Sequence, residues 1–123
     1  MSESLSPDLS KSGFLYRFEV FLPVTSNAGA LIDPEKFDGL TLELSEKFGG
    51  ISFDYPYGGS GGVNGMWYSS VTHIFHRDNN AFIMVLTKAE NGAIKFFQDN
   101  LKKWQKKFGQ EKILIIFHKV QSF

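Results

Sequence analysis

The chain has 123 residues, its 13 basic and 13 acidic side chains balance, and it contains no cysteine. The length predicts one domain, and the zero net charge argues against a general nucleic-acid or anionic-membrane binder. The lack of cysteine excludes disulfides, thiolate zinc sites and a cysteine nucleophile. No apolar run reaches the roughly 20 residues of a membrane span, and the polar N-terminus is not typical of a secretory signal. We therefore expect a cytoplasmic protein.

Residues 1–12 are rich in serine, and we expect them to form a disordered or loosely packed N-terminal tail. Residues 13–123 then form a single predicted domain. Its first strand is expected at 14–22, where side chains alternate between two faces, and Pro23 ends it. One face carries Phe14, Tyr16, Phe18, Val20 and Leu22, and the other carries Leu15, Arg17, Glu19 and Phe21.

A helix is predicted next, between residues 33 and 48. Asp33 is a typical N-cap, and Pro34 is favoured at the first helical position. Apolar residues then recur at spacings of three and four (Phe37, Leu40, Leu44 and Phe48). Gly49 and Gly50 end the helix because glycine readily adopts the left-handed conformation of a C-terminal cap.

Extended segments are predicted at 51–57, 66–77 and 81–87. The first of them alternates and ends at a glycine-rich stretch, GGSGGVNG at 58–65. The residues Asp78, Asn79 and Asn80 between the other two are turn-prone. The segment from 66 to 87 is therefore either a hairpin of two strands or one long bent strand, and we favour the hairpin.

A second helix is predicted from about residue 91 to 108, with Gly109 as its cap. Its apolar stripe consists of Ile94, Phe97, Leu101, Trp104 and Phe108. The last strand, at 112–120, is apolar on both faces, which is typical of a central strand. This order of elements predicts an α+β domain, a ferredoxin-like βαββαβ sandwich with an antiparallel sheet, two helices on one face and a glycine-rich hairpin insertion.

Three short motifs carry a resemblance to known proteins. FGG at 48–50 and FGQE at 108–111 each open a strand, and a Gly-x-Trp stands at 65–67. In these motifs the chain resembles a group of small uncharacterised ferredoxin-like proteins over roughly residues 14–120. The resemblance implies the fold and brings no catalytic residue, because the group has no assigned reaction.

The glycine-rich stretch is compatible with a phosphate loop or with a simple turn. A phosphate loop needs a following helix and a lysine, but the chain has no lysine between Lys47 and Lys88, and the next residues are typical of a strand. A flexible hairpin connection is the interpretation that we favour. In a functional alternative, the loop is a mobile flap over a small-molecule pocket lined by Tyr55, Tyr57 and Trp67.

Three histidines are the candidates for polar chemistry. On a strand, His73 and His76 point to opposite faces and cannot share a metal ion. We therefore predict no metal site and no cofactor. His76, Asp78 and His118 form a possible polar site, since an aspartate can orient a histidine that acts as a general base. No catalytic residue is assigned.

The two predicted helices carry opposite charges. The second helix has five lysines against one acid between residues 95 and 107, and the first is acidic. We favour electrostatic complementarity within one chain or between chains. The alternative is a nucleic-acid-associated protein whose Lys102, Lys103 and Lys106 contact phosphates, although the chain lacks the aromatic motif of an RNA-recognition sheet.

The number of aromatic side chains is high for this length, with 13 phenylalanines, 4 tyrosines and 2 tryptophans. Two helices on one face of a small sheet are not expected to hide all of them. We expect a set of rings on the free sheet face, as an interface or ligand pocket: Phe21, Tyr55, Tyr57, Trp67, Phe75 and Phe117.

The leading hypothesis from the sequence is a non-enzymatic binding or assembly module that forms a homo-dimer or higher homo-oligomer through this face. Two copies would pack sheet against sheet or join edge strands into one continuous sheet. The competing hypothesis is a small-molecule enzyme of the dimeric ferredoxin-like type, with a pocket near the loop at 58–67. Neither membrane nor nucleic acid is a favoured partner.

Overall fold

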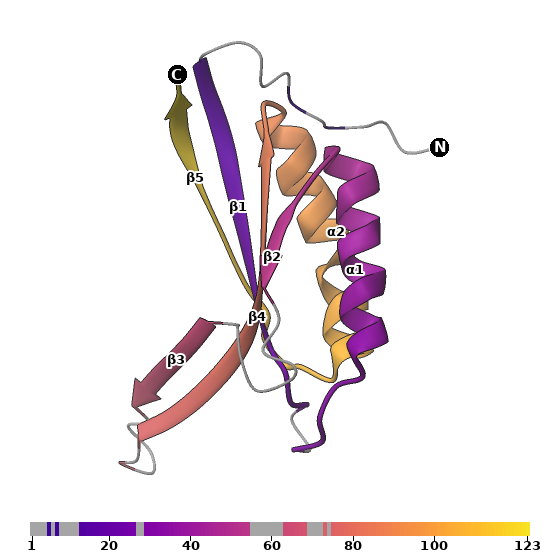
Figure 1. Cartoon of the computed structure of the whole chain (residues 1–123), viewed down its shortest axis with the longest axis vertical. Coiled ribbons are helices and arrows are strands. Elements are labelled where there is room, and N and C mark those ends of the chain that lie inside the picture. Colours follow the sequence, from indigo (N-terminus) through magenta and orange to yellow (C-terminus); the bar gives the residue numbers. More distant parts are fainter. Residues whose placement is uncertain are drawn as a thin grey trace.

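The computed structural model describes Leu5, Pro7 and residues 13–26, 29–54, 63–68, 73 and 75–123, with only the backbone described at 63–68 and 75–79. In chain order the elements are β1 (Gly13–Pro23), α1 (Pro34–Phe48), β2 (Ser52–Asp54), β3 (Val63–Tyr68), β4 (Phe75–Thr87), α2 (Glu90–Phe108) and β5 (Leu114–Ser122). Figure 1 shows both helices on one side of the sheet, so neither of them lies on the opposite side.

The sheet confirms the predicted ferredoxin-like fold. Its strands have the order β2-β4-β1-β5, and every neighbouring pair is antiparallel. β3 is an additional strand that pairs with the first half of β4. The resulting hairpin bends away from the helices at one end of the sheet (Figure 1). Most of the glycine-rich stretch, residues 58–62, lies outside the described residues.

Two expectations about strands are wrong. β4 is one continuous strand that runs through Asp78, Asn79 and Asn80, because these residues pair with β3 in a regular register instead of forming a turn. β5 lies at the edge of the sheet and not at its centre, since among the described strands it pairs only with β1. Apolar residues on both faces therefore mark an exposed strand here.

The helix boundaries follow from their end residues. Asp33 accepts a hydrogen bond from the backbone N–H of Glu35 at 3.0 Å, which satisfies one of the free N–H groups of the first turn of α1. Gly49 (φ 81°) and Gly109 (φ 62°) end the two helices in the left-handed conformation that glycine adopts without strain. Among the described residues, neither helix is long and apolar enough to cross a membrane.

The core is a cluster of rings between the helices and the sheet. The Phe97 ring of α2 stacks on Phe18 of β1 at 4.9 Å and on Phe48 of α1 at 5.6 Å. The side chain of Phe18 also stacks on Phe117 of β5, with ring centroids 5.0 Å apart. Trp104 packs edge-on against Phe97 and is 1% exposed. One ring cluster thus joins both helices to two strands.

A carboxylate in this region joins the two helices. Glu43 of α1 accepts a hydrogen bond from Trp104 Nε1 at 2.8 Å, and its second oxygen pairs with Lys103 Nζ at 2.9 Å. The expected charge complementarity between the helices therefore exists within one chain at this position. Glu43 satisfies the N–H group of a buried indole, so its role is structural.

We predict that Glu43→Ala destabilises the protein. It leaves the buried N–H of Trp104 without its acceptor, which costs about 1–3 kcal/mol and lowers the melting temperature by roughly 3–10 °C. The control is Glu46→Ala, an exposed position on the same helix, which should change stability by less than about 0.5 kcal/mol. Thermal unfolding followed by circular dichroism measures both. Equal melting temperatures for the two variants would show that the Glu43–Trp104 bond contributes nothing.

The start of α2 is tied to the strands by two polar contacts. The buried hydroxyl of Thr87 donates to the carbonyl of Leu5 at 2.8 Å and accepts from the N–H of Ala89 at 3.1 Å. The hydrogen bond between Tyr16 of β1 and Glu90, together with partial burial and the charge of Glu90, raises the pKa of Tyr16 above its ordinary value of 10.0. The neutral phenol is therefore the form that the folded protein prefers.

This preference predicts a loss of stability at alkaline pH. Because the pKa of Tyr16 is higher in the folded than in the unfolded state, the stabilisation is complete below about pH 10 and disappears as pH rises through the folded-state pKa. Tyr16→Phe removes this dependence. Urea unfolding of both proteins at about pH 8 and about pH 11 measures the difference. If the gap in unfolding free energy between the two proteins stays the same at both pH values, the pKa of Tyr16 is not raised.

Candidate functional site

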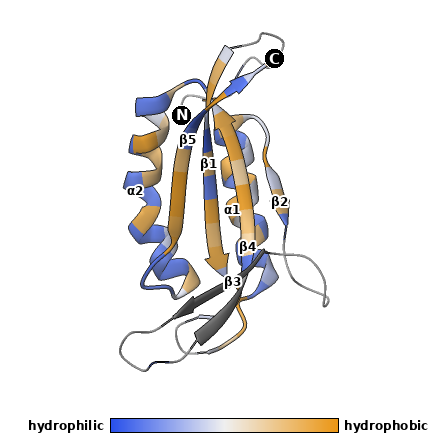
Figure 2. Ribbon diagram, turned by 90° about the vertical axis from the view of Figure 1, so that its left-hand side faces the viewer, coloured by the Kyte–Doolittle hydropathy of each residue, from blue (hydrophilic) through white to orange (hydrophobic). Residues whose placement is uncertain are grey.

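The candidate site is the side of the sheet turned away from the helices, which we call the open face. Glu19 lies at its centre, paired with Met84 of β4 and with Ile116 of β5. The strand registers place the following residues on the open face: Arg17, Glu19 and Phe21 of β1; Phe82, Met84 and Leu86 of β4; Leu114, Ile116 and His118 of β5. In Figure 2, β4 and β5 are largely hydrophobic where they flank the more polar β1.

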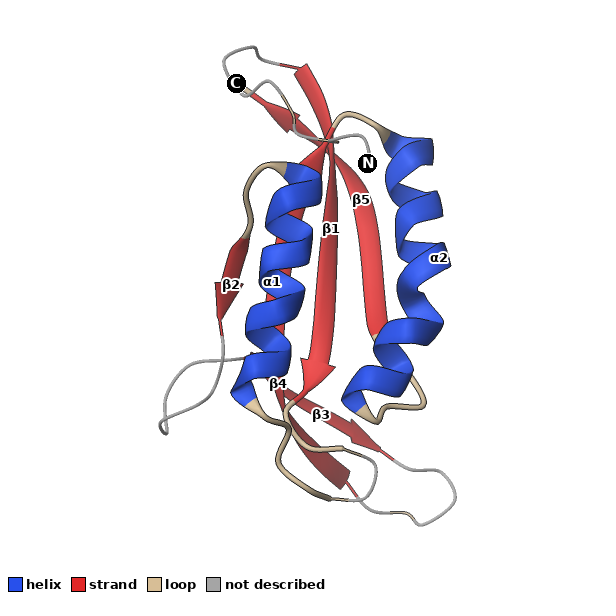
Figure 3. Cartoon of the chain, turned by 90° about the vertical axis from the view of Figure 1, so that its right-hand side faces the viewer, coloured by secondary structure: helices blue, strands red, loops and turns tan. Residues whose placement is uncertain are grey.

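Apolar side chains dominate the open face. Phe21 and Phe82 are cross-strand partners with ring centroids 5.2 Å apart. Met84 and Leu86 are half-buried, whereas Leu114 and Ile116 are 57% and 43% exposed. Figure 3 shows both helices on the side of the sheet that faces the viewer, so neither of them covers these residues. A sheet face of this kind normally packs against another surface.

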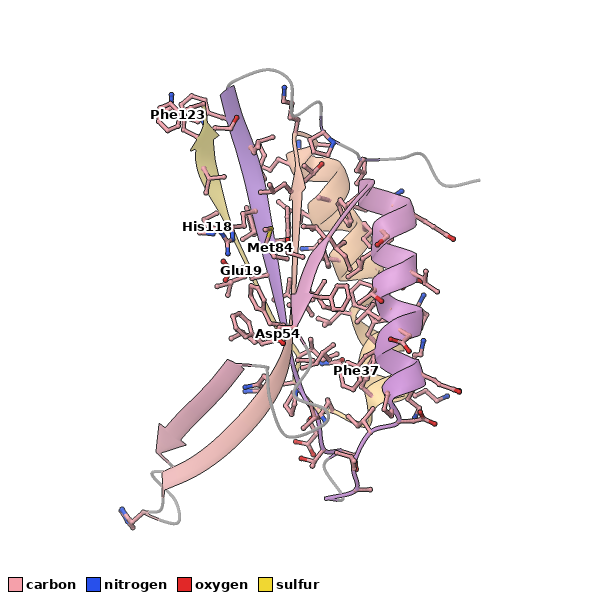
Figure 4. All side chains as sticks on the ribbon, viewed as in Figure 1. Glu19, Phe37, Asp54, Met84, His118 and Phe123 are labelled. Atoms are coloured by element: carbon pink, nitrogen blue, oxygen red, sulfur yellow. The ribbon has the colours of Figure 1, made fainter. Side chains whose placement is uncertain are left out.

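Three ionisable side chains interrupt the apolar surface. Glu19 Oε1 lies 2.8 Å from Arg17 Nε and 3.4 Å from His118 Nε2. The Arg17 Nε–H has no well-aligned hydrogen bond within the described part of the chain, so the first contact is an ion pair. The Glu19 side chain is 14% exposed, and Figure 4 shows it beside His118 on the side opposite the helices. A shielded carboxylate beside an arginine and a histidine can accept a hydrogen bond from a bound group.

The predicted ring residues are divided among different places. Phe21 lies on the open face as expected. The placement of Phe117 on that face is wrong, because its ring stacks on Phe18 on the helix side. Tyr55 and Tyr57 lie outside the described residues. Trp67 and Phe75 belong to β3 and β4, where only the backbone is described.

The predicted polar site is not assembled by the sheet. His118 pairs with Arg17, which lies opposite Leu86 of β4. Asp78 is found eight residues earlier in β4, roughly 25 Å along a strand. His76 pairs with Trp67 in the same hairpin as Asp78. His118 therefore belongs with Arg17 and Glu19 and not with His76 and Asp78.

The lysines of α2 are exposed but partly paired. Lys103 pairs with Glu43, and Lys95 pairs with Asp99 at 2.9 Å. Lys102 and Lys106 make no ion pair with the described acidic side chains. Since two of the helix's cations already have partners, the structure gives a phosphate-binding role for Lys102, Lys103 and Lys106 no further support.

An open hollow of about 440 Å³ lies where α1 passes into β2. It is lined by Pro7, Phe48, the backbone of Gly49 and Gly50, Ile51, Ser52, Met84 and Leu86. None of these lining residues is ionisable, so the hollow offers no acid or base for catalysis. Likewise, the described residues contain no group of three potential metal ligands.

Arg17 and Glu19 are the site residues that sequence reasoning missed. The signal was present, because alternation placed both on the same face of a strand as Phe21. What the sequence did not reveal is that β1 is central, with apolar strands on both sides.

The sequence matches no protein-family model and no curated protein. Among solved structures, the chain is similar to a phage SAM lyase in its apo state, with a TM-score of 0.51 and 16% sequence identity. The likeness covers 98% of this chain and 92% of that one. At this level of identity it shows the fold, which is ferredoxin-like in type, and nothing of the activity. Membership of the group marked by FGG, Gly-x-Trp and FGQE stays a prediction.

Proposed function

We propose that the protein is a non-enzymatic assembly module, in which the open face packs against the open face of a second copy. One observation carries the proposal: the open face combines Phe21, Phe82, Met84, Leu114 and Ile116 in one surface that neither α1 nor α2 covers. Burying such side chains contributes about 25 cal/mol for each Å² of apolar area removed from water. Two sheets in face-to-face contact lie about 10 Å apart, close enough for these side chains to interdigitate.

The charged residues of the open face fit this arrangement. A buried carboxylate is costly unless cations accompany it. Glu19 already has the guanidinium of Arg17 beside it in the monomer, so the second copy does not have to supply a counter-charge. A two-fold axis through the interface would use the same patch on both copies, as in most homodimers.

Met84→Lys tests the proposal. Met84 pairs with Glu19 in the sheet, so a lysine at this position gains a cross-strand carboxylate and the monomer stays folded. In the assembly, the new lysine brings one additional cation from each copy into an apolar contact, which weakens the contact. We expect the mass measured by light scattering to fall by half, with an unchanged circular dichroism spectrum.

The matched control is Leu42→Lys on the outer side of α1, where Leu42 is 65% exposed. This variant should keep the mass of the wild-type protein. A monomeric wild-type protein, or a Met84→Lys variant of unchanged mass, would refute assembly through the open face.

A second candidate is a small-molecule enzyme, favoured by the meeting of Glu19, Arg17 and His118 on one apolar surface. Shielded carboxylates in such surroundings are found at catalytic sites as well as in structural ion pairs. The phage SAM lyase shares the fold over nearly its whole length, which makes SAM the first substrate to test. In this hypothesis Glu19 is the proton acceptor, and Arg17 and His118 position it.

The test is incubation of the protein with SAM, followed by chromatography of the products. If the second candidate is right, the wild-type protein consumes SAM and Glu19→Gln reduces the rate by about 100-fold or more, the usual range for a lost general base. Glu46→Gln, on the exposed side of α1, is the control and should keep the rate of the wild-type protein. No consumption by the wild-type protein removes SAM as the substrate.

A further inference from the structure

The outer edge of β5 is unusual for a soluble protein. The strand has nine residues, none of them buried, and its first four are Leu114, Ile115, Ile116 and Phe117. Among the described strands, β5 pairs only with β1, so alternate backbone N–H and C=O groups point to a free edge. Natural proteins protect such edges with charges, proline, bulges or very short strands. The first half of β5 has none of these.

Where β2 forms it, the opposite edge of the sheet is protected. β2 has only three residues, all exposed, and ends in the charged Asp54. Its short length and its carboxylate are the devices that discourage pairing with another strand. The contrast between β2 and β5 favours β5 as the place where a further strand can bind.

A groove accompanies the free edge on the helix side. It lies between α2 and β5 and has a volume of about 210 Å³. Phe18 and Phe97 contribute buried rings to its lining, together with Ile94 and Leu101 of α2 and the 46% exposed Phe117 of β5. A strand added to β5 would place every second side chain in this groove and the others beside Leu114 and Ile116 on the open face.

The residues of α2 that line the groove are uncharged. Ile94, Gln98 and Leu101 recur at spacings of four and three and line the groove together. The lysines of this helix lie at other positions, at 95, 102, 103, 106 and 107. Figures 2 and 3 show α2 running beside β5 at this edge of the molecule.

We propose that β5 pairs with β5 of a second copy, antiparallel about a two-fold axis, so that two sheets become one continuous sheet. The incoming strand must be apolar on both faces, and β5 itself meets this requirement with Ile115 and Phe117 on one face and Leu114 and Ile116 on the other. The contact is self-complementary, because each copy supplies both the edge and the strand that covers it.

This edge contact uses a different surface from the open-face contact proposed above, and the two can be tested separately.

Leu101→Lys tests the edge contact. The long lysine side chain keeps its apolar stem on the helix surface in the monomer, but it places a cation in the groove that the second copy must fill. Leu42→Lys makes the same change on α1 and is the control. The readout is amide hydrogen exchange of β5, residue by residue, together with the mass in solution. The outward amides of β5 are those that do not hydrogen-bond to β1. Packing of two open faces involves side chains only, so it leaves these amides unprotected.

In the wild-type protein we expect slow exchange at every amide of β5, including those that do not bond to β1. In Leu101→Lys, at a protein concentration about 100 times the dissociation constant of the wild-type dimer, the outward amides should exchange roughly 10-fold faster, and the mass should fall by half. Should Leu101→Lys fail to fold, Gln98→Lys at an exposed position of the same stripe replaces it.

Fast exchange of the outward amides in the wild-type protein overturns the proposal, as does a Leu101→Lys variant with unchanged mass and exchange. The proposal is also overturned if the outward amides of β5 become protected only when a peptide from another protein is added. If Met84→Lys halves the mass and Leu101→Lys does not, the edge contact fails and the open-face contact stands. The reverse result leaves the edge contact standing alone.

Discussion

A stack of three rings sets which side chains of β5 face the helices. Both proposed surfaces depend on this orientation. Phe18 lies between Phe97 of α2 and Phe117 of β5, with centroids 4.9 and 5.0 Å away and interplanar angles of 17° and 14°. The stack draws the Phe117 side chain to the helix side of the sheet. Because side chains alternate along a strand, Leu114, Ile116 and His118 must then point to the open face.

The unequal covering of the sheet explains why so much apolar surface is exposed. Both helices pack on one face, where rings such as Phe37, Phe48 and Trp104 are almost completely buried. The helix layer hides more aromatic residues than the composition suggested. The surface left over consists mostly of aliphatic side chains on β4 and β5, around the pair of Phe21 and Phe82. Exposed apolar area, and not aromatic residues as such, is therefore the physical basis of the proposed assembly.

Much of the fold was readable from the sequence, because its signals are local. Asp33, Gly49 and Gly109 marked helix ends, and the apolar spacing identified the faces that α1 and α2 bury. The errors concern long-range pairing. Asp78, Asn79 and Asn80 favour turns in isolation, but pairing with β3 keeps them extended. β5 was read as central since its composition matches a buried strand, and composition cannot distinguish burial within a chain from burial between chains. The meeting of Glu19 with His118 depends on strand order, which no local pattern shows.

Gly109 has a consequence for how tolerant the chain is of insertions. Its φ of 62° disfavours any side chain, and a Cβ there would lie 3.1 Å from the Cβ of Ser26. The next residue, Gln110, is buried and donates a hydrogen bond to the carbonyl of Thr25. This short link thus fixes which side chains of β5 point to the helices and which point to the open face. One extra residue between Gln110 and Leu114 would invert this alternation, so that every side chain of β5 would move to the opposite face of the sheet.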